Sequence, residues 1–443
     1  MPPPTSPLDW SSVLRSAPCA STITSSLFRG IPGDFWKLPS NCNNYAMRAG
    51  SLHYEMPVMY PRLATVPDHS FLLLGPRATG KTTWLRQHLA GALWFNLLLD
   101  DDYLPLLGSA AIFRERVEAQ PPGSWIVVDE VQRLPGLLNE VHDLISRHGD
   151  GYRFALSGSS ARKLRRLDVN LLAGRVIERS MFPFVANELG ADFDLETALR
   201  FGTIPGICTD ETYRVDKLRA YVHTYLRQEI QQEALVKDLG SFHRYLKVAA
   251  LMHGQVVNQK AIARDAAVAR TTVQRYFDTL VDTLIGTLLP AWRPKAKVRE
   301  AAKPKFYFFD PGVVRAIRDV ADEPLADADS GALLEGLILH ELRAAIAYGG
   351  YGGELSYWST PGSKEIDFIW SKGERRVAVE VKSSRQWRSR YAKTINEFLD
   401  AGMITRGVVV YRGGQRFRSG RVDGLPVEDF LSLISTDGFF ASR

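Results

Sequence analysis

Short apolar runs alternate with stretches of helical periodicity in the part of the chain that follows residue 56. Apolar runs of about four to eight residues, bounded by polar or glycine-rich sequence, are typical of buried strands in a parallel sheet. The pattern predicts strands at 71–74, 125–128 and 153–156, and helices at 81–93 and 131–147. Strands that alternate with helices indicate an α/β domain.

The pattern changes after residue 182, where the chain becomes mainly helical through 239. Residues 242–289 predict a small all-helical unit. A basic stretch at 292–305 links it to a strand at 306–309, and a last α/β unit runs from 333 to 433. The chain therefore divides into at least three folded units, as its length leads us to expect.

Residues 1–55 differ from the rest of the chain, because they are rich in Ser, Thr, Asn and Pro and lack sustained periodicity. A segment that cannot bury a continuous apolar face does not offset its loss of chain entropy. We expect either a disordered leader or a start codon assigned too far upstream.

Composition excludes several classes of protein. Hydrophobic residues make up 45% and charged residues 23% of the 443, which are ordinary globular values. Three widely spaced cysteines form neither a disulfide framework nor a zinc knuckle. No apolar run approaches the roughly 18–20 residues of a membrane span, and no secretory signal is present, so we expect a cytoplasmic protein without membrane contact. The net charge of +6 leans mildly towards anionic partners.

The strand at 71–74 runs directly into GPRATGKT and then a helix, which is the context that a P-loop requires. Gly75 and Gly80 allow the backbone to turn N–H groups towards phosphate oxygens, and the helix presents its positive end to the same anion. We expect Lys81 to reach the β- and γ-phosphates and Thr82 to bind magnesium. The ligand is thus Mg-ATP, held by Gly75, Pro76, Arg77, Ala78, Thr79, Gly80, Lys81, Thr82 and Thr83, with Asp129 and Ser159 from later strands.

Two acids follow the second predicted strand, in WIVVDEVQRLP. Asp129 is placed to hold magnesium through water, and Glu130 to orient the attacking water. The alternative is a strand that ends in two solvent-exposed acids, which would have the same sequence.

The next strand ends in hydroxyls, so that Ser157 or Ser159 is a candidate polar sensor of the γ-phosphate, with ordinary turn chemistry as the alternative. Arginines at 162, 165, 166 and 175 are candidates for a γ-phosphate arginine, and Arg175 in LLAGRV is preferred.

The motifs GPRATGKT, VVDEVQRLP, ALSGSSARKL, LLAGRV and FPFVANELG, in this order, resemble the prokaryotic AAA-type ATPases that are fused to a C-terminal domain of unknown function. The resemblance continues through YVHTYLRQEI and KFYFFDPGV into the last unit. It implies ATP binding by the loop and the acidic strand, and it leaves the function of the C-terminal domain open.

Residues 256–285 predict two helices joined by a tight turn, with Ile262 and Val273 on their apolar stripes. This is the pattern of a winged-helix unit whose second helix contacts DNA, and the basic stretch at 292–305 could form its wing. The side chains expected on the exposed face are Arg270, Thr271, Thr272, Gln274 and Arg275. A unit used only for packing or protein contact would share this pattern.

A predicted hairpin in the last unit carries two carboxylates and a lysine. Glu380 and Lys382 are two residues apart and share one face of their strand. Asp367 and Glu380 are equidistant from the junction of Gly373 and Glu374, so a hairpin centred there makes them cross-strand neighbours. Such a site suits a hard cation and a group that steadies a water nucleophile.

This D…ExK arrangement resembles the PD-(D/E)XK nuclease fold. The resemblance implies that Asp367 and Glu380 bind magnesium, that Lys382 assists water attack on a phosphodiester, and that Glu335 completes the shell. Glu341 is a rival for the helical acid, because periodicity alone barely separates the two. A solvent-facing hairpin, or the same fold without activity, remains as an alternative.

We therefore interpret the chain as an α/β protein whose units are a leader (1–55), a P-loop AAA-type ATPase core (56–182), a helical lid (183–240), a winged-helix unit (241–310) and a C-terminal PD-(D/E)XK nuclease-like domain (325–435). The expected function is Mg-ATP hydrolysis that gates binding or cleavage of nucleic acid, DNA being favoured. The alternative is an ATP-dependent conformational or signalling switch, with an inactive nuclease-like fold as a protein-binding module. A homo-oligomer or a protein partner is compatible with both.

Overall fold

The computed structural model describes residues 59–160, 172, 174–226, 238–293, 303–360, 364–435 and 439–440. The leader at 1–55, most of the basic stretch at 292–305, and the arginines at 162, 165 and 166 lie outside the described residues.

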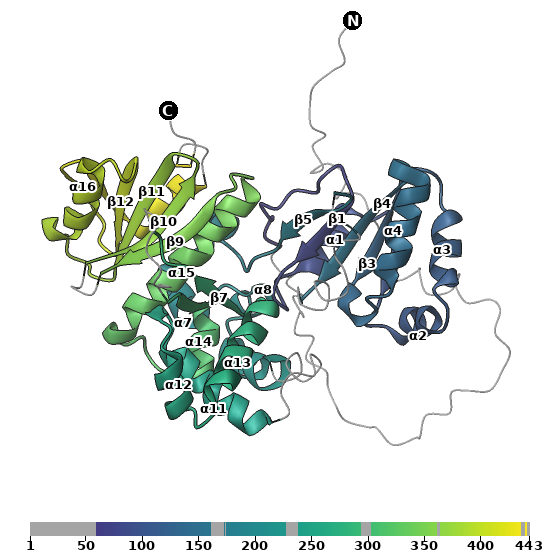
Figure 1. The fold of residues 1–443 in the computed structure, drawn as a ribbon, viewed down its shortest axis with the longest axis horizontal. Helices are drawn as coiled ribbons and strands as arrows, with labels where there is room; N and C mark the ends of the chain where they lie inside the picture. Colours follow the sequence, from purple (N-terminus) through teal and green to yellow (C-terminus); the bar gives the residue numbers. More distant parts are fainter. Residues whose placement is uncertain are drawn as a thin grey trace, which may run out of the picture. The chain divides into compact units, whose positions relative to one another are not determined.

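The N-terminal unit is built on a five-stranded sheet of order β2-β3-β4-β1-β5, in which every pair is parallel. Figure 1 shows its strands with helices packed around them. The strands are β1 (Phe71–Leu74), β2 (Leu93–Asn96), β3 (Ser124–Asp129), β4 (Tyr152–Gly158) and β5 (Ile177–Ser180). The helices are α1 (Lys81–His88), α2 (Asp100–Gly108), α3 (Ala111–Glu118), η2 (Val131–Arg133), α4 (Leu137–His148) and η3 (Gly149–Gly151).

The core of this unit follows the two-residue period of its strands. Ile126 and Val128 of β3 pack in one apolar cluster, whereas Val127 packs on the other side with Trp84 and Leu85 of α1. Both faces of the central strands are therefore covered, as the uninterrupted apolar runs predict. Because the strands are parallel, the residues that follow β1, β3 and β4 meet at one edge of the sheet.

Two strands differ from the sequence prediction. The helix expected at 81–93 ends at His88, and Leu93–Asn96 forms β2 instead. A turn separates α1 from β2, but the apolar residues of the two elements together have the spacing of a single helix. The other strand, β5, has the sequence IERS and no fully buried side chain, because it lies at the edge of the sheet. The prediction missed β5 because this sequence contains no apolar run.

The middle of the chain is mainly helical but contains a small sheet. Its helices are α6 (Ala186–Leu189), η5 (Gly190–Asp192), α7 (Leu195–Phe201), α8 (Pro205–Cys208), α9 (Arg214–Ala220), η6 (Tyr221–Leu226), α11 (Leu239–Leu251), α12 (Gln259–Asp265), α13 (Arg270–Asp282) and α14 (Pro311–Ile317). The strands β6 (Gln255–Val256), β7 (Gly286–Leu289) and β8 (Lys305–Phe308) form an antiparallel sheet of order β6-β8-β7. The prediction that 242–289 is all-helical was therefore wrong, since it missed two strands that are completed only by pairing with β8.

The C-terminal unit is a six-stranded mixed sheet of order β13-β14-β12-β11-β10-β9. Its strands are β9 (Glu354–Ser359), β10 (Glu365–Lys372), β11 (Arg375–Lys382), β12 (Arg406–Tyr411), β13 (Phe417–Ser419) and β14 (Val422–Pro426). Its helices are α15 (Asp327–Tyr348), η7 (Ser389–Ala392), α16 (Lys393–Asp400) and α17 (Val427–Ile434).

Alternate residues of β11 belong to different cores. Val379 packs in the cluster that contains residues of α15, and Ala378 packs with residues of α16. The sheet is therefore covered on both faces.

Among the helices that the structure describes, none combines the length and apolar character needed to cross a membrane.

Candidate functional site

The loop after β1 has the backbone of a phosphate cradle. Ala78 and Gly80 both adopt the left-handed region, with φ of 66° and 88°. Gly75 has no room for a side chain, because a Cβ there would lie 2.2 Å from the carbonyl oxygen of Met181. The Lys81 ammonium donates to the carbonyls of Gly75 and Pro76 at 2.8 and 3.1 Å, so the lysine lies across its own loop.

Asp129 joins the loop to the ends of the neighbouring strands. Its carboxylate is completely buried at the end of β3. One oxygen accepts a hydrogen bond of 2.7 Å from the Thr82 hydroxyl at the start of α1, and the other accepts from the Ser157 hydroxyl on β4. The structure thus brings Thr82 and Asp129 together as the sequence predicted, and it adds Ser157 as their partner.

Glu130 follows in a conformation that non-glycine residues rarely adopt, with φ of 59° and ψ of 47°. Its N–H donates to the Ser157 hydroxyl at 3.1 Å. Its carboxylate accepts from the Gln132 amide and from the Ser159 hydroxyl, the latter at 3.3 Å. Backbone strain of this kind costs of order 1–3 kcal/mol and clusters at functional sites. Here it turns the carboxylate towards Ser159, at the same edge of the sheet as the loop.

Arg175 is not brought to this loop. It precedes β5, and Ile177 of β5 pairs with Phe71 at the start of β1. Parallel pairing therefore places Arg175 at the edge of the sheet opposite to the loop that follows Leu74. The preference for Arg175 as a γ-phosphate arginine came from the sequence motif, which carried no information about strand register.

The second group of predicted residues lies on the hairpin of β10 and β11. Phe368 pairs with Val379 and Lys372 with Arg375, so the turn is centred on residues 373–374. Asp367 and Glu380 are the residues that follow the Phe368–Val379 pair on the two strands. One Asp367 oxygen accepts from the N–H of Val381 at 2.8 Å. Lys382 donates to Glu380 at 2.5 Å.

A third element supplies a lysine that the sequence analysis did not assign to this site. The Lys305 ammonium, on β8, lies 2.5 Å from Glu365, 3.6 Å from Glu335 and 3.7 Å from Asp367. Its side chain is only 4% exposed, so these carboxylates provide its charge balance. The Tyr307 hydroxyl also donates to Glu335, at 3.1 Å.

These contacts place Glu335, and not Glu341, beside the carboxylate cluster. Glu335 reaches the cluster through Lys305 and Tyr307. Glu341 lies on the other side of α15, where it accepts a hydrogen bond of 2.8 Å from the N–H of Ala186. Six residues separate the two positions on α15, which is not a whole number of turns.

Burial and crowding set the charges of this cluster. Burial, reinforced by the charge of Asp367, raises the pKa of Glu335 and of Glu380 to about 8. Burial also raises the pKa of Asp367. Burial alone would lower the pKa of Lys305, but the attraction of Glu335, Asp367 and Glu365 outweighs it and the pKa is raised. Burial would likewise lower the pKa of Lys382, but the attraction of Glu380 and Asp367 outweighs it and the pKa is raised, so both lysines remain charged near neutral pH.

In the parts of the chain that the structure describes, no three His, Cys, Asp or Glu side chains are arranged as a metal-binding group. Within the cluster the cations beside the carboxylates are Lys305 and Lys382. One buried oxygen of Glu380 has no hydrogen-bond partner, which leaves it available to a further cation or donor. Lys382 lies beside the other oxygen of the Glu380 carboxylate.

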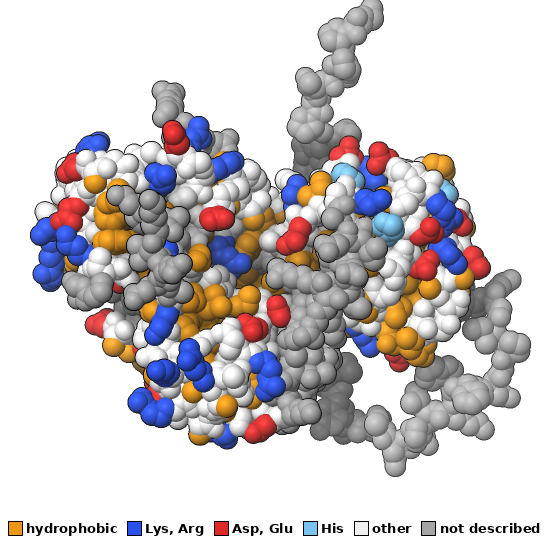
Figure 2. All heavy atoms as spheres, in the orientation of Figure 1, with side chains coloured by type: hydrophobic (Ala, Val, Ile, Leu, Met, Phe, Trp, Pro, Cys, Tyr) orange, Lys and Arg blue, Asp and Glu red, His pale blue; other side chains and the backbone are white. Residues whose placement is uncertain are grey.

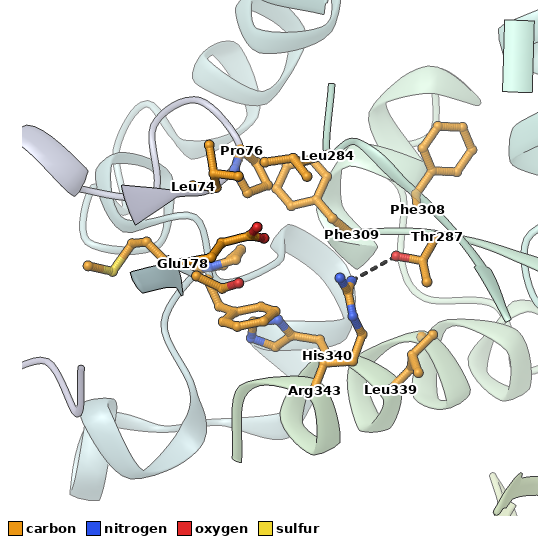
Figure 3. Close-up of a pocket in the computed structure, with 16 residues that line it drawn as sticks. Leu74, Pro76, Glu178, Leu284, Thr287, Phe308, Phe309, Leu339, His340 and Arg343 are labelled. Atoms are coloured by element: carbon orange, nitrogen blue, oxygen red, sulfur yellow. Dashed lines mark hydrogen bonds between the residues drawn. The ribbon is translucent and has the colours of Figure 1, made fainter. Parts of the chain in front are cut away.

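A small cavity of about 180 Å³ opens between the start of the loop, β5, Leu284–Thr287 and α15 (Figure 3). Arg343 crosses it and donates to the Thr287 hydroxyl at 2.7 Å. Ligand pockets usually enclose about 300–1,000 Å³. This cavity is therefore too small for a nucleotide, and we assign it no ligand.

The second helix of the predicted winged-helix unit presents the side chains that were expected on its surface. Arg270, Thr271, Gln274 and Arg275 of α13 are exposed and Thr272 is half-buried, whereas Val273 is buried. Figure 2 shows Lys and Arg side chains over this unit, scattered among hydrophobic and acidic ones.

Comparison with known families divides the chain into three consecutive parts. Residues 68–190 match the AAA domain, residues 192–323 match a domain of unknown function (DUF8612), and residues 330–430 match another domain of unknown function (DUF4143). The first match and the loop geometry together support a P-loop ATPase in an α/β domain with a parallel sheet. Neither of the other two descriptions names an activity.

The chain is also similar to two mycobacterial proteins, Rv2008c of Mycobacterium tuberculosis and Mb2031c of Mycobacterium bovis, both described as uncharacterized. Each is 27% identical over 374 residues, which cover 84% of this chain and 82% of the relative. Among solved structures, the Aeropyrum pernix ORC1 protein in complex with DNA aligns with 58% of this chain and 87% of its own, at 13% identity and a TM-score of 0.28. A TM-score of this size does not establish a shared overall fold.

The sequence analysis did not predict several residues of these sites. Gln132, Lys305, Tyr307 and Glu365 each reach their partners through contacts that span elements. One signal was available: Lys305 and Tyr307 are two residues apart in KFYF, so they share a face of β8. A lysine and a tyrosine on one face of a buried strand indicate a nearby carboxylate.

The buried Glu341 gives the fold a pH dependence. Burial raises its pKa to about 8 from an ordinary value near 4.5. A carboxyl group whose pKa is higher in the folded state contributes stability fully below its unfolded pKa and loses that contribution as the pH rises to the folded pKa. The variant Glu341→Gln keeps an acceptor for the N–H of Ala186. We predict that its melting temperature minus that of the wild type is larger at pH 8 than at pH 5. Scanning calorimetry at these two pH values measures the difference.

The exposed Glu354 provides the control. The melting temperature of Glu354→Gln should follow that of the wild type at both pH values. An advantage of Glu341→Gln that is the same at pH 5 and pH 8 would show that Glu341 is charged to the same extent in both states of the chain.

Proposed function

We propose that this chain binds ATP with magnesium at Gly75–Thr82 and hydrolyses it. The hydrogen bond between Thr82 and Asp129 supports this most directly, because it places two oxygen ligands of the kind that magnesium prefers beside the loop. Bound magnesium would supply positive charge that offsets the phosphate oxygens. Lys81 would exchange the carbonyls of Gly75 and Pro76 for the β- and γ-phosphates.

The residues around Asp129 provide the remaining roles of a hydrolase. Glu130 would accept a proton from the attacking water, with its carboxylate oriented by Gln132 and Ser159. Ser159 follows β4, whose Gly158 carbonyl accepts a hydrogen bond from the N–H of Gly75, so it would lie near the terminal phosphate. Because Arg175 lies at the opposite edge of the sheet, we give it no role in the loop of its own chain.

The first test separates binding from hydrolysis. Glu130→Gln should keep ATP affinity within about twofold and lower kcat by roughly 10²–10⁴, since it removes the base but no phosphate contact. Isothermal titration of the nucleotide and a phosphate-release assay measure the two quantities. Hydrolysis by Glu130→Gln at the wild-type rate would show that another group is the base.

We infer further that the nucleotide state controls contact with nucleic acid. Support comes from the exposed Arg270, Thr271, Gln274 and Arg275 of α13, which suit a phosphate backbone and base edges. It also comes from Asp367, Glu380 and Lys382, which lie on the paired strands β10 and β11, with Lys382 bonded to Glu380. If this unit is a nuclease, Asp367 and Glu380 would hold a divalent ion, Lys382 would assist the attack of water on a phosphodiester, and Glu335 would complete the site.

One observation favours the alternative function. Lys305 already neutralises Glu335, Glu365 and Asp367 from a different unit of the chain. A cluster balanced in this way can serve as structure, and the C-terminal unit would then be a protein-binding module moved by ATP. The two functions differ in whether the hairpin takes up a divalent ion.

The second test uses manganese on the full chain that carries Lys81→Ala, so that the ATP site contributes no nucleotide-dependent uptake. We predict one manganese bound at millimolar concentration or below, lost in Asp367→Ala and Glu380→Ala and kept in Lys382→Ala. Calorimetry measures the uptake. Cleavage of plasmid DNA with ATP and magnesium, by chains that keep Lys81, measures the activity that Lys382→Ala should abolish. A folded protein that takes up no divalent ion would rule out the nuclease function and leave the binding module.

A further inference from the structure

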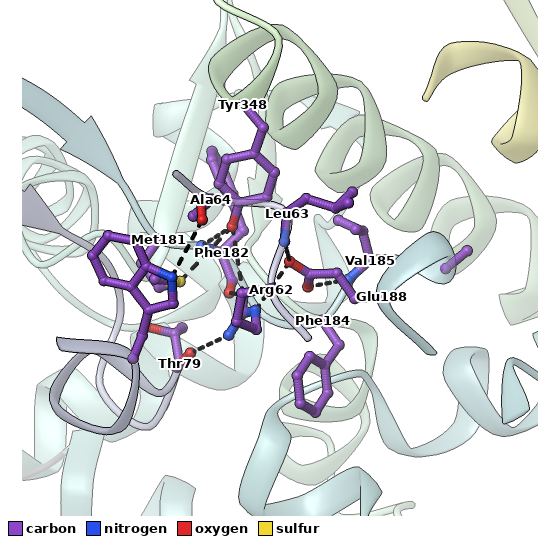
Figure 4. Close-up of polar contacts among 12 residues, drawn as sticks. Arg62, Leu63, Ala64, Thr79, Met181, Phe182, Phe184, Val185, Glu188 and Tyr348 are labelled. Carbon is purple, nitrogen blue, oxygen red and sulfur yellow. Dashed lines mark hydrogen bonds and ion pairs between the residues drawn. The ribbon is translucent and has the colours of Figure 1, made fainter. Parts of the chain in front are cut away.

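Arg62 lies in the segment before β1, and its side chain is only 6% exposed. Figure 4 shows that it reaches the phosphate loop, the segment after β5 and α6 at once. One terminal nitrogen donates to the carbonyl of Thr79 at 2.8 Å, and the other donates to the carbonyl of Phe182 at 2.6 Å. Its Nε lies 3.0 Å from the Glu188 carboxylate, whose side chain has no solvent exposure.

The bond to Thr79 fixes the orientation of one peptide in the loop. The C=O and N–H of a trans peptide point in opposite directions, so a Thr79 carbonyl held by Arg62 directs the Gly80 N–H away from Arg62. A flip of the peptide between Thr79 and Gly80 changes the φ of Gly80, which is 88°, and glycine accepts either sign of φ at little steric cost. Without Arg62, the carbonyl could turn into the phosphate cradle and repel the anion.

The same arginine connects the loop to the C-terminal unit. Besides the Phe182 carbonyl, it approaches the Tyr348 hydroxyl at 3.5 Å, and that hydroxyl accepts from the N–H of Phe182 at 3.1 Å. Two more side chains of α15 bind the same segment: His340 contacts the Phe184 carbonyl at 3.1 Å, and Glu341 accepts from Ala186 at 2.8 Å. The segment that leaves the ATPase sheet is therefore held by Arg62 and by α15 together.

The guanidinium is suited to this position for a physical reason. It presents its donors in a rigid planar fork, whereas a lysine offers one flexible point charge. Two backbone carbonyls on separate segments, those of Thr79 and Phe182, accept hydrogen bonds from Arg62, and the Glu188 carboxylate is its ion-pair partner. A single ammonium cannot hold all three in the same geometry. A lysine would preserve the ion pair with Glu188 and lose the bridge.

We propose that Arg62 is the positioning residue of the phosphate loop, and that it couples ATP binding to α15 through Phe182 and Tyr348. The coupling rests on the proposed function, because it requires that the loop binds ATP. It identifies a route by which the C-terminal unit affects the ATP site, since α15 also carries Glu335 of the carboxylate cluster.

The test compares three conservative variants of the full chain. Arg62→Lys should raise the Kd for a non-hydrolysable ATP analogue and the KM for ATP about tenfold, because it loses bonds to the loop. Tyr348→Phe should raise both about threefold, although Tyr348 does not touch the loop. In both variants kcat at saturating ATP should stay within about twofold of the wild type.

Tyr245→Phe is the matched control. Tyr245 is completely buried, and its hydroxyl has no hydrogen-bond partner within the described part of the chain. This variant should keep the wild-type Kd, KM and kcat. It removes the same atom as Tyr348→Phe without affecting the connection to Arg62.

The possible failures are distinguishable. If Arg62→Lys and Tyr348→Phe lose kcat in proportion to folded protein while KM and Kd stay unchanged, Arg62 has a structural role only and the inference is wrong. If both variants bind the analogue with the wild-type Kd while Lys81→Ala does not, the ATPase assignment stands and the positioning role is wrong. A wild-type chain that binds no analogue would overturn the proposed function as well.

Discussion

A buried carboxylate at the end of β3 holds the candidate ATP site together. Asp129 has no exposure, so its oxygens need partners, and the Thr82 and Ser157 hydroxyls provide them. These partners come from the start of α1 and from β4, which are far apart in sequence. The carboxylate therefore fixes the edge of the sheet where the loop, Glu130 and Ser159 meet. The left-handed Glu130 is acceptable there because its N–H is held by the same Ser157.

The same rule about buried charges shapes the rest of the molecule. Arg62, Glu188, Lys305 and Glu335 are largely withdrawn from water, and each has a partner of opposite charge or a polar backbone group. Removing one partner of such a pair is costly, because it leaves a buried charge without compensation. Groups of this kind hold the elements in register. Two of them contact α15, Arg62 through Tyr348 and Lys305 through Glu335, so one helix contacts both candidate sites.

The sequence predicted those parts of the sites that depend on neighbouring residues. Gly75 to Thr82 follows β1 directly, and Asp129 and Glu130 end the next apolar run, so adjacency along the chain was sufficient. The hairpin that carries Asp367 and Glu380 on its two strands also followed from counting outwards from a two-residue turn. The strands at 71–74 and 125–128 were found for the same reason, because buried strands show continuous apolar runs.

The sequence did not predict contacts that depend on how separate elements meet. Lys305 appeared to be part of a solvated basic stretch, yet pairing of β8 with β6 and β7 buries it against the carboxylates. Arg62 lies outside every recognised motif, and its partners are 17 to 286 residues away. The sequence did not predict the register of β5 either, and this register places Arg175 at the edge of the sheet opposite to the loop. No local pattern encodes these distances.

The central claim is that the loop at Gly75–Thr82 supports ATP hydrolysis, and steady-state phosphate release tests it most directly. The purified full chain should release phosphate from ATP in a saturable reaction that requires magnesium and is lost in Lys81→Ala, because this lysine is the cation placed to reach the phosphates. Phosphate release by the wild type at or below the level of Lys81→Ala, across saturating ATP and magnesium, would contradict the account.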